Sequence, residues 1–280
     1  MSAIAMTAIQ ADGEGFTPPG PGDFNLPPIG HTSETAPTFE FLGQTMYWGV
    51  TKPMLQLVLS VVLIFTFFYL ASRHRAMVPG KLQYIGETAY GFVRNGLARD
   101  VIGSRDFMRF VPYLVALFFF ILVNNYFGLI PGIQFPTFSR AGMAYSLALL
   151  SWAIYNYVGM RKHGVGGYFK LQTVPAGVRG PVLALLVPLE FFSNILVRPV
   201  TLALRLFANM FAGHMLLILF ALGGEYLLLH TSGLTPIAGI LSFVMFMGVS
   251  VLEMLVMALQ AYVFVLLTSM YIAGALADEH

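Results

Sequence analysis

Residues 198–214 read R-P-V-T-L-A-L-R-L-F-A-N-M-F-A-G-H, between the apolar runs P-V-L-A-L-L-V-P-L and M-L-L-I-L-F-A-L. The segment places Arg205, Asn209 and His214 in a stretch that otherwise has the composition of a membrane-spanning helix. A charge at the centre of such a helix costs about 2.5–3.5 kcal/mol on insertion scales. We therefore expect this helix to face a group that compensates the charge, or to use the charge in its function.

The composition of the whole chain is that of an integral membrane protein. Of its 280 residues, 57% are hydrophobic and only 10% are charged, and the mean hydropathy is +0.75. Cysteine is absent, which excludes disulfides, thiolate metal sites and cysteine nucleophiles. The net charge of +2 is small, so the placement of the charges is more informative than their sum.

Residues 1–40 predict a disordered extracytoplasmic tail ahead of a membrane domain at 41–280. The tail contains P-P-G-P-G, L-P-P-I-G and five acidic residues, with no lysine, arginine or long apolar run. A secretory signal needs a basic start before an apolar stretch, and a mitochondrial transit peptide is rich in arginine, so neither fits. We expect the tail to remain on the mature chain.

Four apolar blocks, the last long enough for two helices, predict an all-α membrane protein with about five transmembrane crossings, because about 20 apolar residues cross roughly 30 Å of hydrocarbon. The predicted spans are 54–72, 111–130, 141–160, 181–222 and 234–276. Apolar residues at helical spacing also predict an amphipathic helix at about 81–102, lying along the membrane surface.

The basic residues predict how the chain is oriented. Eleven of the 15 lysines and arginines fall in residues 73–109 and 161–179. Under the positive-inside rule these segments face the cytoplasm. Five crossings then leave the N-terminus outside and the C-terminus in the cytoplasm.

The last two predicted helices are longer than a bilayer requires. Spans 181–222 and 234–276 each measure roughly 63 Å at 1.5 Å per residue. We expect a steeply tilted hairpin, or kinks where Pro188 and Pro199 interrupt the backbone hydrogen bonding.

The polar residues of this hairpin fall into two layers. If Gln260 is level with Arg205 in an antiparallel pair, Glu253 is level with His214 to within about 3 Å. One layer then holds Arg205, Asn209 and Gln260, and the other holds His214 with Glu253, nearer the outside. Histidine and glutamate both exchange protons, so the outer layer is typical of half of a proton path.

Residues 198–214, taken with L-E-M-L-V-M-A-L-Q-A-Y-V-F-V-L-L-T-S-M-Y at 252–271, resemble the a subunit of F-type ATP synthases. The resemblance covers about residues 45–280 and includes N-Y-F-G-L-I-P-G and L-Q-Y-I-G-E. It implies a non-catalytic stator subunit that conducts protons to and from c-ring carboxylates through two offset half-channels. The implied setting is a bacterial plasma membrane, with an organelle inner membrane as the alternative, and the implied partners are the c ring, b-type peripheral stalk subunits and membrane lipid.

The family carries one indispensable arginine in R-L-F-x-N, which matches Arg205. The resemblance implies that Arg205 faces the c-ring carboxylate, keeps it ionised and blocks direct leakage of protons between the half-channels. Asn209 and Gln260 match positions that support this site. A structural alternative stays open, in which Arg205 forms a buried ion pair with Glu190 or Glu253.

The resemblance also implies the residues of the two half-channels. His214 and Glu253 match the polar pair of the outer half-channel, although some members carry the acid on the first helix and the histidine on the second. Glu190 matches the acid of the inner half-channel, but precedes Arg198 by eight residues where many members have seven. As alternatives, His214 could be a hydrogen-bonded structural residue, and Arg198 could extend to cytoplasmic headgroups.

Other classes of function have less support. A self-contained proton-coupled transporter would commonly show internal repeats, and none is evident. No G-x-x-x-x-G-K-[ST] loop predicts nucleotide binding, and the isolated loop histidines predict neither a metal site nor a cofactor. The basic residues follow membrane topology, which gives no indication of nucleic-acid binding. We expect Asn124 and Asn125 to join helices by hydrogen bonds.

Overall fold

The computed structural model describes most of the chain from residue 49 onward. The described residues are 16, 18–20, 28–29, 38–41, 44–47, 49–73, 78–130, 133, 135–174 and 182–277. The chain forms two compact units. The first unit comprises Met1–Leu63, Leu122–Arg140 and Ala208–Ala258. The second unit comprises Ile64–Ile121, Ala141–Phe207 and Leu259–His280.

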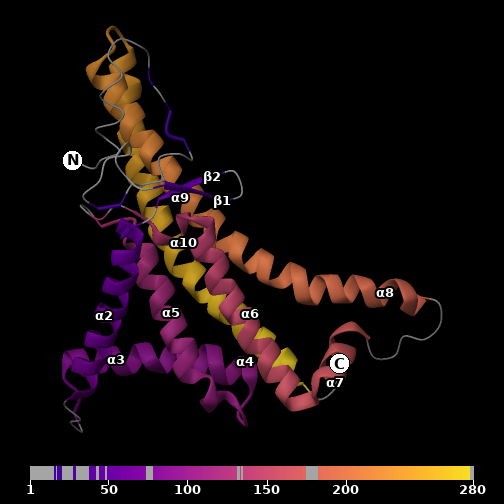
Figure 1. The fold of residues 1–280 in the computed structure, drawn as a ribbon. Coiled ribbons are helices and arrows are strands. Elements are labelled where there is room, and N and C mark those ends of the chain that lie inside the picture. The colour runs from indigo at the N-terminus through magenta and orange to yellow at the C-terminus, as the bar shows by residue number, and fades with distance from the viewer. Residues whose placement is uncertain are drawn as a thin grey trace. The chain divides into compact units, whose positions relative to one another are not determined.

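Helices dominate the described residues, which confirms the predicted all-α membrane class (Figure 1). The first half contains α2 (Lys52–Arg73), α3 (Lys81–Gly91), the π-helix η2 (Phe92–Arg99), α4 (Asp100–Ile102), η3 (Phe107–Arg109) and α5 (Val111–Tyr126). The second half contains η4 (Thr137–Ser139), α6 (Ala141–His163), α7 (Val165–Thr173), α8 (Val182–Phe191), the π-helix η5 (Phe192–Val197), α9 (Arg198–Leu229) and α10 (Thr235–Leu276).

A short hairpin lies where the predicted tail meets the membrane domain. Strand β1 (Thr38–Phe41) pairs antiparallel with β2 (Gln44–Tyr47), and Thr38 lies opposite Tyr47. The predicted disorder of residues 1–40 falls almost entirely outside the described residues. Regular structure nevertheless begins at Thr38, three residues inside the predicted tail boundary.

Three helical stretches of the described chain are long and apolar enough to cross a membrane: Lys52–Arg73, Leu185–Leu229 and Thr235–Leu276. Helix α5 is also apolar, but has only 16 residues. It ends four residues before the predicted boundary, because the chain turns at Gly128, whose N–H donates to Asn125 O at 3.1 Å. The number of crossings stays a prediction.

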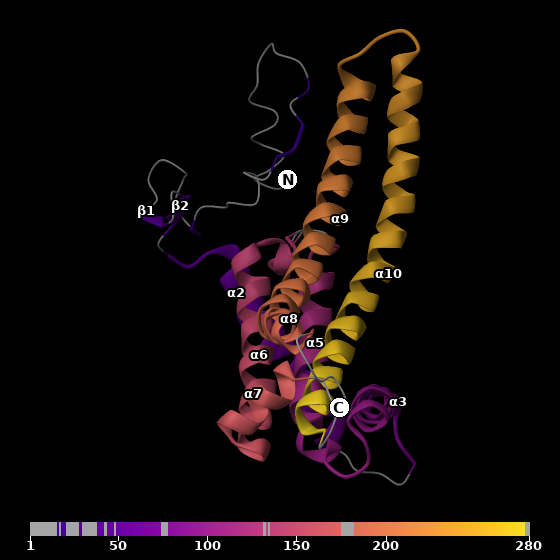
Figure 2. The same cartoon turned by 90° about the vertical axis from the view of Figure 1, so that its right-hand side faces the viewer.

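The predicted surface helix at 81–102 is formed by α3, η2 and α4 in the second unit. Figure 1 shows α3 running crosswise to α5, and Figure 2 views α3 nearly end on. Val93 and Leu97 of η2 are fully buried, whereas Leu82 and Ile85 of α3 are exposed. The segment therefore packs its second half against the rest of the second unit and leaves apolar residues of its first half exposed.

Helices α9 and α10 form an antiparallel hairpin within the first unit, where Figures 1 and 2 both show them side by side. Ser242 Oγ donates to Phe220 O at 2.8 Å. A Cβ atom added to Gly224 would lie 3.1 Å from the Phe243 ring, so the backbones approach closely there. This packing keeps Gly223 and Gly224 helical, and α9 continues seven residues past its predicted end at 222.

The two prolines of the long helical segment lie on either side of the π-helix η5. Pro199 has no N–H, so Ile195 O, four residues earlier, lacks its usual α-helical donor. Trp152 Nε1 of α6 donates to this carbonyl at 2.9 Å. The proline irregularity predicted from the sequence is thus present within the second unit as a local π-helix, a rare form found often at functional sites.

Polar contacts join helices within the first unit. Asn124 Nδ2 donates to Ser60 Oγ of α2 at 2.9 Å, and Asn125 Nδ2 donates to Met257 O of α10 at 3.2 Å. Both asparagines are completely buried. Their helix-joining role, predicted from the sequence, is confirmed.

In the second unit, a glycine allows α7 to pack against α6. Tyr168 Oη donates to Asn156 Oδ1 at 2.9 Å, and burial raises the pKa of Tyr168 to about 12, so the hydroxyl keeps its proton. The Tyr168 ring lies directly against Gly159, where an added Cβ atom would overlap it. Gly142, on the same helix, has nothing within 4 Å of such an atom.

We expect Gly159→Ala to destabilise the protein by about 1–3 kcal/mol, because the new methyl group overpacks the contact with Tyr168. Gly142→Ala should be neutral or stabilising by less than about 1 kcal/mol, since it gains helix propensity without a clash. Thermal unfolding of both purified variants measures the difference. Equal melting temperatures would contradict the close α6–α7 packing.

Candidate functional site

The predicted polar residues lie along the two longest helices and the segment before them. Helix α9 carries Arg205, Asn209 and His214 in that order, and α10 carries Glu253 and Gln260. Both helices are otherwise mostly apolar, although α9 also carries Arg198 at its start and Glu225 near its end. Ionisable groups in such helices usually line a bundle interior, a water-filled path or a contact with another chain.

In the first unit, the turn of α9 that carries His214 lies level with Glu253 on α10. A Cβ atom added to Gly213 would lie 2.9 Å from Glu253 Oε1 and 3.1 Å from its Cδ. Gly224 of α9 lies against Phe243 of α10. Gly213, 11 residues earlier on α9, lies against Glu253, ten residues later on α10. This steady antiparallel register agrees with the outer layer expected from the sequence.

Both side chains of this pair are buried. His214 is 5% exposed and Glu253 is 4% exposed. Neither carboxyl oxygen of Glu253 accepts a hydrogen bond from the residues that the structure describes. An ionised carboxylate held in such surroundings costs several kcal/mol unless it is paired or hydrogen-bonded. Glu253 is therefore placed where gaining or losing a proton has a large energetic consequence.

Arg205 differs from this pair because its side chain is exposed. In the part of the chain that the structure describes, its guanidinium makes no ion pair or hydrogen bond. Within the second unit, which holds both residues, Arg205 and Glu190 form no ion pair; a pair with Glu253, which belongs to the first unit, stays a prediction. A permanent cation thus projects from the side of an apolar helix.

Asn209 and Gln260 are less exposed than Arg205. Gln260 is 3% exposed, and Asn209 is half-buried. Both side chains take part in contacts within the protein. Whether they support the arginine, as the sequence suggests, stays a prediction.

Glu190 lies in the second unit, where it is held by a residue that the sequence interpretation missed. Asn194 Nδ2 donates to Glu190 Oε2 at 3.0 Å and to Gln172 O of α7 at 2.7 Å. Asn194 follows Glu190 by four residues, a spacing that places both on one helix face and that could have indicated the contact. Arg198 does not pair with Glu190; its guanidinium lies 5.2 Å from the centre of the Tyr271 ring, a cation–π distance.

Gly213 is the other residue of the site that the sequence pattern did not indicate. Its lack of a side chain provides the space that the Glu253 carboxyl occupies. The sequence signal is a glycine directly before an intramembrane histidine, which does not by itself identify the group that fills the space. Within the described residues, no group of three or more His, Asp or Glu side chains could hold a metal ion.

The fold and these side chains define an integral helical membrane protein with ionisable residues on a long helical hairpin. Comparison with known proteins then gives the family. The sequence model for "ATP synthase A chain" matches residues 54–273. The chain is 65% identical to "ATP synthase subunit a" of a Nocardioides species and 49% identical to that of Paenarthrobacter aurescens, each over the full length of both chains. It is 40% identical to the Streptomyces lividans subunit a, over 96% of this chain and 91% of that one.

The chain therefore belongs to the ATP synthase subunit a family, the membrane Fo subunit of F-type ATP synthases. The resemblance predicted from residues 198–214 and 252–271 is confirmed. The protein is an integral membrane component of the ATP synthase complex, with the proton-translocating stator role of the Fo sector in ATP synthesis.

We expect Gly213→Ala to lower ATP-driven proton pumping about tenfold while the complex still assembles, because the new methyl group displaces the Glu253 carboxyl and small misplacements of reacting groups are costly. Pumping is measured in inverted membrane vesicles. Gly223→Ala on the same helix is the matched control, since its added Cβ atom would make only an ordinary contact of 3.8 Å with Phe16. Equal pumping by the two variants would contradict the importance of this contact.

Proposed function

We propose that the chain conducts protons between the two sides of a bacterial plasma membrane and the carboxylates of a rotating c ring, through two half-channels that do not meet. Proton entry and exit at separate places convert proton flow into rotation. Each elementary charge that crosses releases roughly 2.3 kcal/mol per 100 mV. The chain itself binds no nucleotide and catalyses no covalent step in this scheme.

The observation that carries the proposal is the exposure of Arg205. A cation on the outer face of an apolar helix needs an anionic partner, and a c-ring carboxylate supplies one of the right charge. Ala208 and Ala212, the next small residues along α9, are also exposed, and such residues favour close approach of another helix. Arg205 would keep the passing carboxylate ionised and prevent protons from moving directly between the half-channels.

In the outer half-channel, we propose that His214 and Glu253 pass protons toward the ring. Their burial at one level of the hairpin supports a shared role, and both groups gain and lose protons. Family members with the acid and histidine exchanged carry the same two chemical groups. Asn209 and Gln260 would complete the site beside Arg205.

In the inner half-channel, we propose that Glu190 receives protons that leave the ring. Its carboxylate is half-buried and is held by Asn194, which also contacts α7 through Gln172 O. This arrangement fixes the carboxylate on one face of the helix, although its spacing from Arg198 differs from that of many relatives. The polar face would line a path to the cytoplasm.

The proposed arrangement in the membrane has about five crossings, the N-terminus outside and the C-terminus in the cytoplasm. The basic segments 73–109 and 161–179 then lie on the cytoplasmic side. The proposed direct partners are the c ring and b-type peripheral stalk subunits. A self-contained transporter is the rival function, and it would purify without a c ring.

Arg205→Ala is expected to abolish ATP-driven proton pumping, because no fixed cation remains to hold the ring carboxylate ionised. The measurement uses inverted vesicles from cells whose only copy carries the substitution, with co-purification of the c ring as the check on assembly. Arg73→Ala, which removes an exposed arginine at the end of α2, is the matched control and should pump normally. Normal pumping by the Arg205 variant with an intact complex would overturn the proposal.

Exchanging the proposed outer pair tests whether its chemistry or its exact arrangement matters. We expect His214→Glu combined with Glu253→His to pump at least several-fold faster than either single substitution, because only the combined variant keeps one acid and one imidazole at this level. Pumping at matched complex content is the readout. A combined variant no better than the worse single variant would show that the two residues do not act as a pair.

A further inference from the structure

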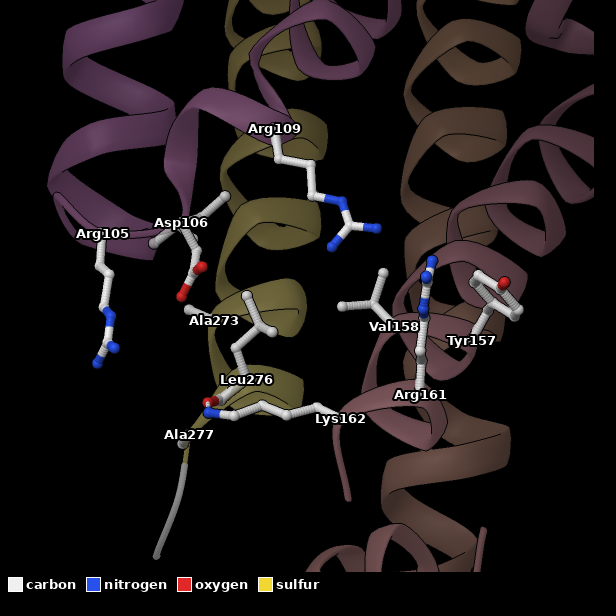
Figure 3. A pocket seen from close by; sticks show the side chains of 11 residues that line it. Arg105, Asp106, Arg109, Tyr157, Val158, Arg161, Lys162, Ala273, Leu276 and Ala277 are labelled. Carbon is white, nitrogen blue, oxygen red and sulfur yellow. Dashed lines mark hydrogen bonds between the residues drawn. The ribbon is translucent and has the colours of Figure 1, made fainter. Parts of the chain in front are cut away.

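A pocket whose lining includes four cationic side chains lies in the second unit, away from the residues assigned to proton transfer. Its volume is about 710 Å³. Arg105 and Arg109 come from the segment before α5, Arg161 and Lys162 come from the end of α6, and the last turn of α10 closes one side (Figure 3). The function proposed above uses none of these residues.

The cationic side chains that line the pocket come from separate elements, and three of them are not paired with an acidic side chain of the described chain. Figure 3 shows Arg109 and Arg161 extending into it from different elements, while Lys162 reaches the end of α10 and Arg105 lies at the edge beyond Asp106. Lys162 Nζ donates to Leu276 O. In the described part of the chain, Arg105, Arg109 and Arg161 make no ion pair or hydrogen bond through their side chains.

The charge of the pocket is strongly positive. Among the residues that the structure describes, four cationic side chains line it against one carboxylate, that of Asp106, which gives these side chains a formal charge of +3. Guanidinium groups present several N–H donors in a planar fork that matches the oxygens of a phosphate group. Like charges held around one space repel each other, so an anion within the space would stabilise the arrangement.

The positive-inside rule explains why basic residues are numerous on this side, but not why four of them meet in one pocket. Lys81 and Lys170 are also basic and exposed, and they do not line it. The pocket also has apolar walls, including Val158 and Ala273, and Tyr157 at its edge is 60% exposed. Tyrosine is enriched where a membrane surface meets water.

We infer that the pocket lies at one face of the membrane, because it is found at the ends of apolar helices. It lies where α6 and α10 end and before α5 begins. We propose that this pocket binds the phosphate group of an anionic phospholipid, with the guanidinium groups of Arg109 and Arg161 as its main donors. Free phosphate has the same chemistry, and the test below separates the two sources.

The experiment uses the assembled ATP synthase in phosphatidylcholine bilayers with a trace of phosphatidylglycerol that carries a photoreactive group near its headgroup. Mass spectrometry measures labelling of peptides that contain residues 105–109 and 157–162. We expect unlabelled phosphatidylglycerol to suppress labelling at roughly tenfold lower concentration than phosphatidylcholine does. Suppression by millimolar inorganic phosphate alone would assign the site to soluble phosphate and would still support phosphate binding.

Arg109→Gln combined with Arg161→Gln should lower the labelling roughly tenfold, because two of the four cations are lost. Lys81→Gln combined with Lys170→Gln removes the same net charge outside the pocket and should leave labelling unchanged. If the glutamine variant does not assemble, Arg109→Lys combined with Arg161→Lys takes its place, because this variant keeps the charge. The lysine variant should bind the lipid more weakly than the native protein does, because the planar guanidinium fork is lost.

Equal suppression by the two unlabelled lipids would overturn the proposal, and this comparison needs no variant. Equal loss of labelling in the pocket variant and in the Lys81 and Lys170 control would also overturn it, because general attraction to the membrane surface would then suffice. The proposal is independent of the proton path. Failure of lipid selectivity leaves the role of Arg205 untouched, and failure of the Arg205 experiment leaves the pocket untouched.

Discussion

The free-energy cost of a permanent charge in hydrocarbon governs the arrangement of this protein. Arg205 lies on a helix that is otherwise suited to lipid, and its side chain is exposed without an ion pair in the described chain. A neutral side chain there would leave α9 compatible with lipid or with any apolar helix. The arginine instead restricts the neighbour on that face to one that brings negative charge or water. In the function that we propose, assembly with an anionic partner is therefore linked to the placement of this single residue.

The rest of the hairpin depends on how closely α9 and α10 approach each other within the first unit. Gly213 and Gly224 on α9 face Glu253 and Phe243 on α10, and neither position has room for a larger residue without movement of its neighbour. Gly239 on α10 likewise approaches Gly224, whose O would lie 3.1 Å from an added Cβ atom. Small residues thus fix the register, and the register sets Glu253 beside the turn that carries His214. The same contacts thus specify the packing of the two helices and the position of the Glu253 carboxyl.

Much of this architecture could be predicted from the sequence, because apolar periodicity and basic clusters respond to the membrane itself. The hairpin helices and the surface helix at 81–102 follow from spacing, whereas the common level of His214 and Glu253 follows only once Gln260 is taken to lie level with Arg205. The partners of individual polar atoms do not follow from spacing. That Pro199 frees Ile195 O is predictable, but the donor, Trp152, lies 43 residues earlier and depends on how α6 packs. The continuation of α9 through Gly223 and Gly224 likewise depends on tertiary contact, which local helix propensity does not record.

The hairpin carries ionisable residues that can become neutral and one that cannot, and they differ in how the free-energy cost of desolvation is compensated. Histidine and glutamate can each become neutral through proton transfer, so His214 and Glu253 are compatible with burial inside the chain. Arginine cannot lose its proton in a protein, and burial without a counter-charge would leave the whole cost uncompensated. The exposed position of Arg205 follows from this difference, because only a surface position lets an external anion reach the guanidinium. Lysine in its place could shed its proton in an apolar site and leave the face neutral, whereas arginine maintains its charge throughout.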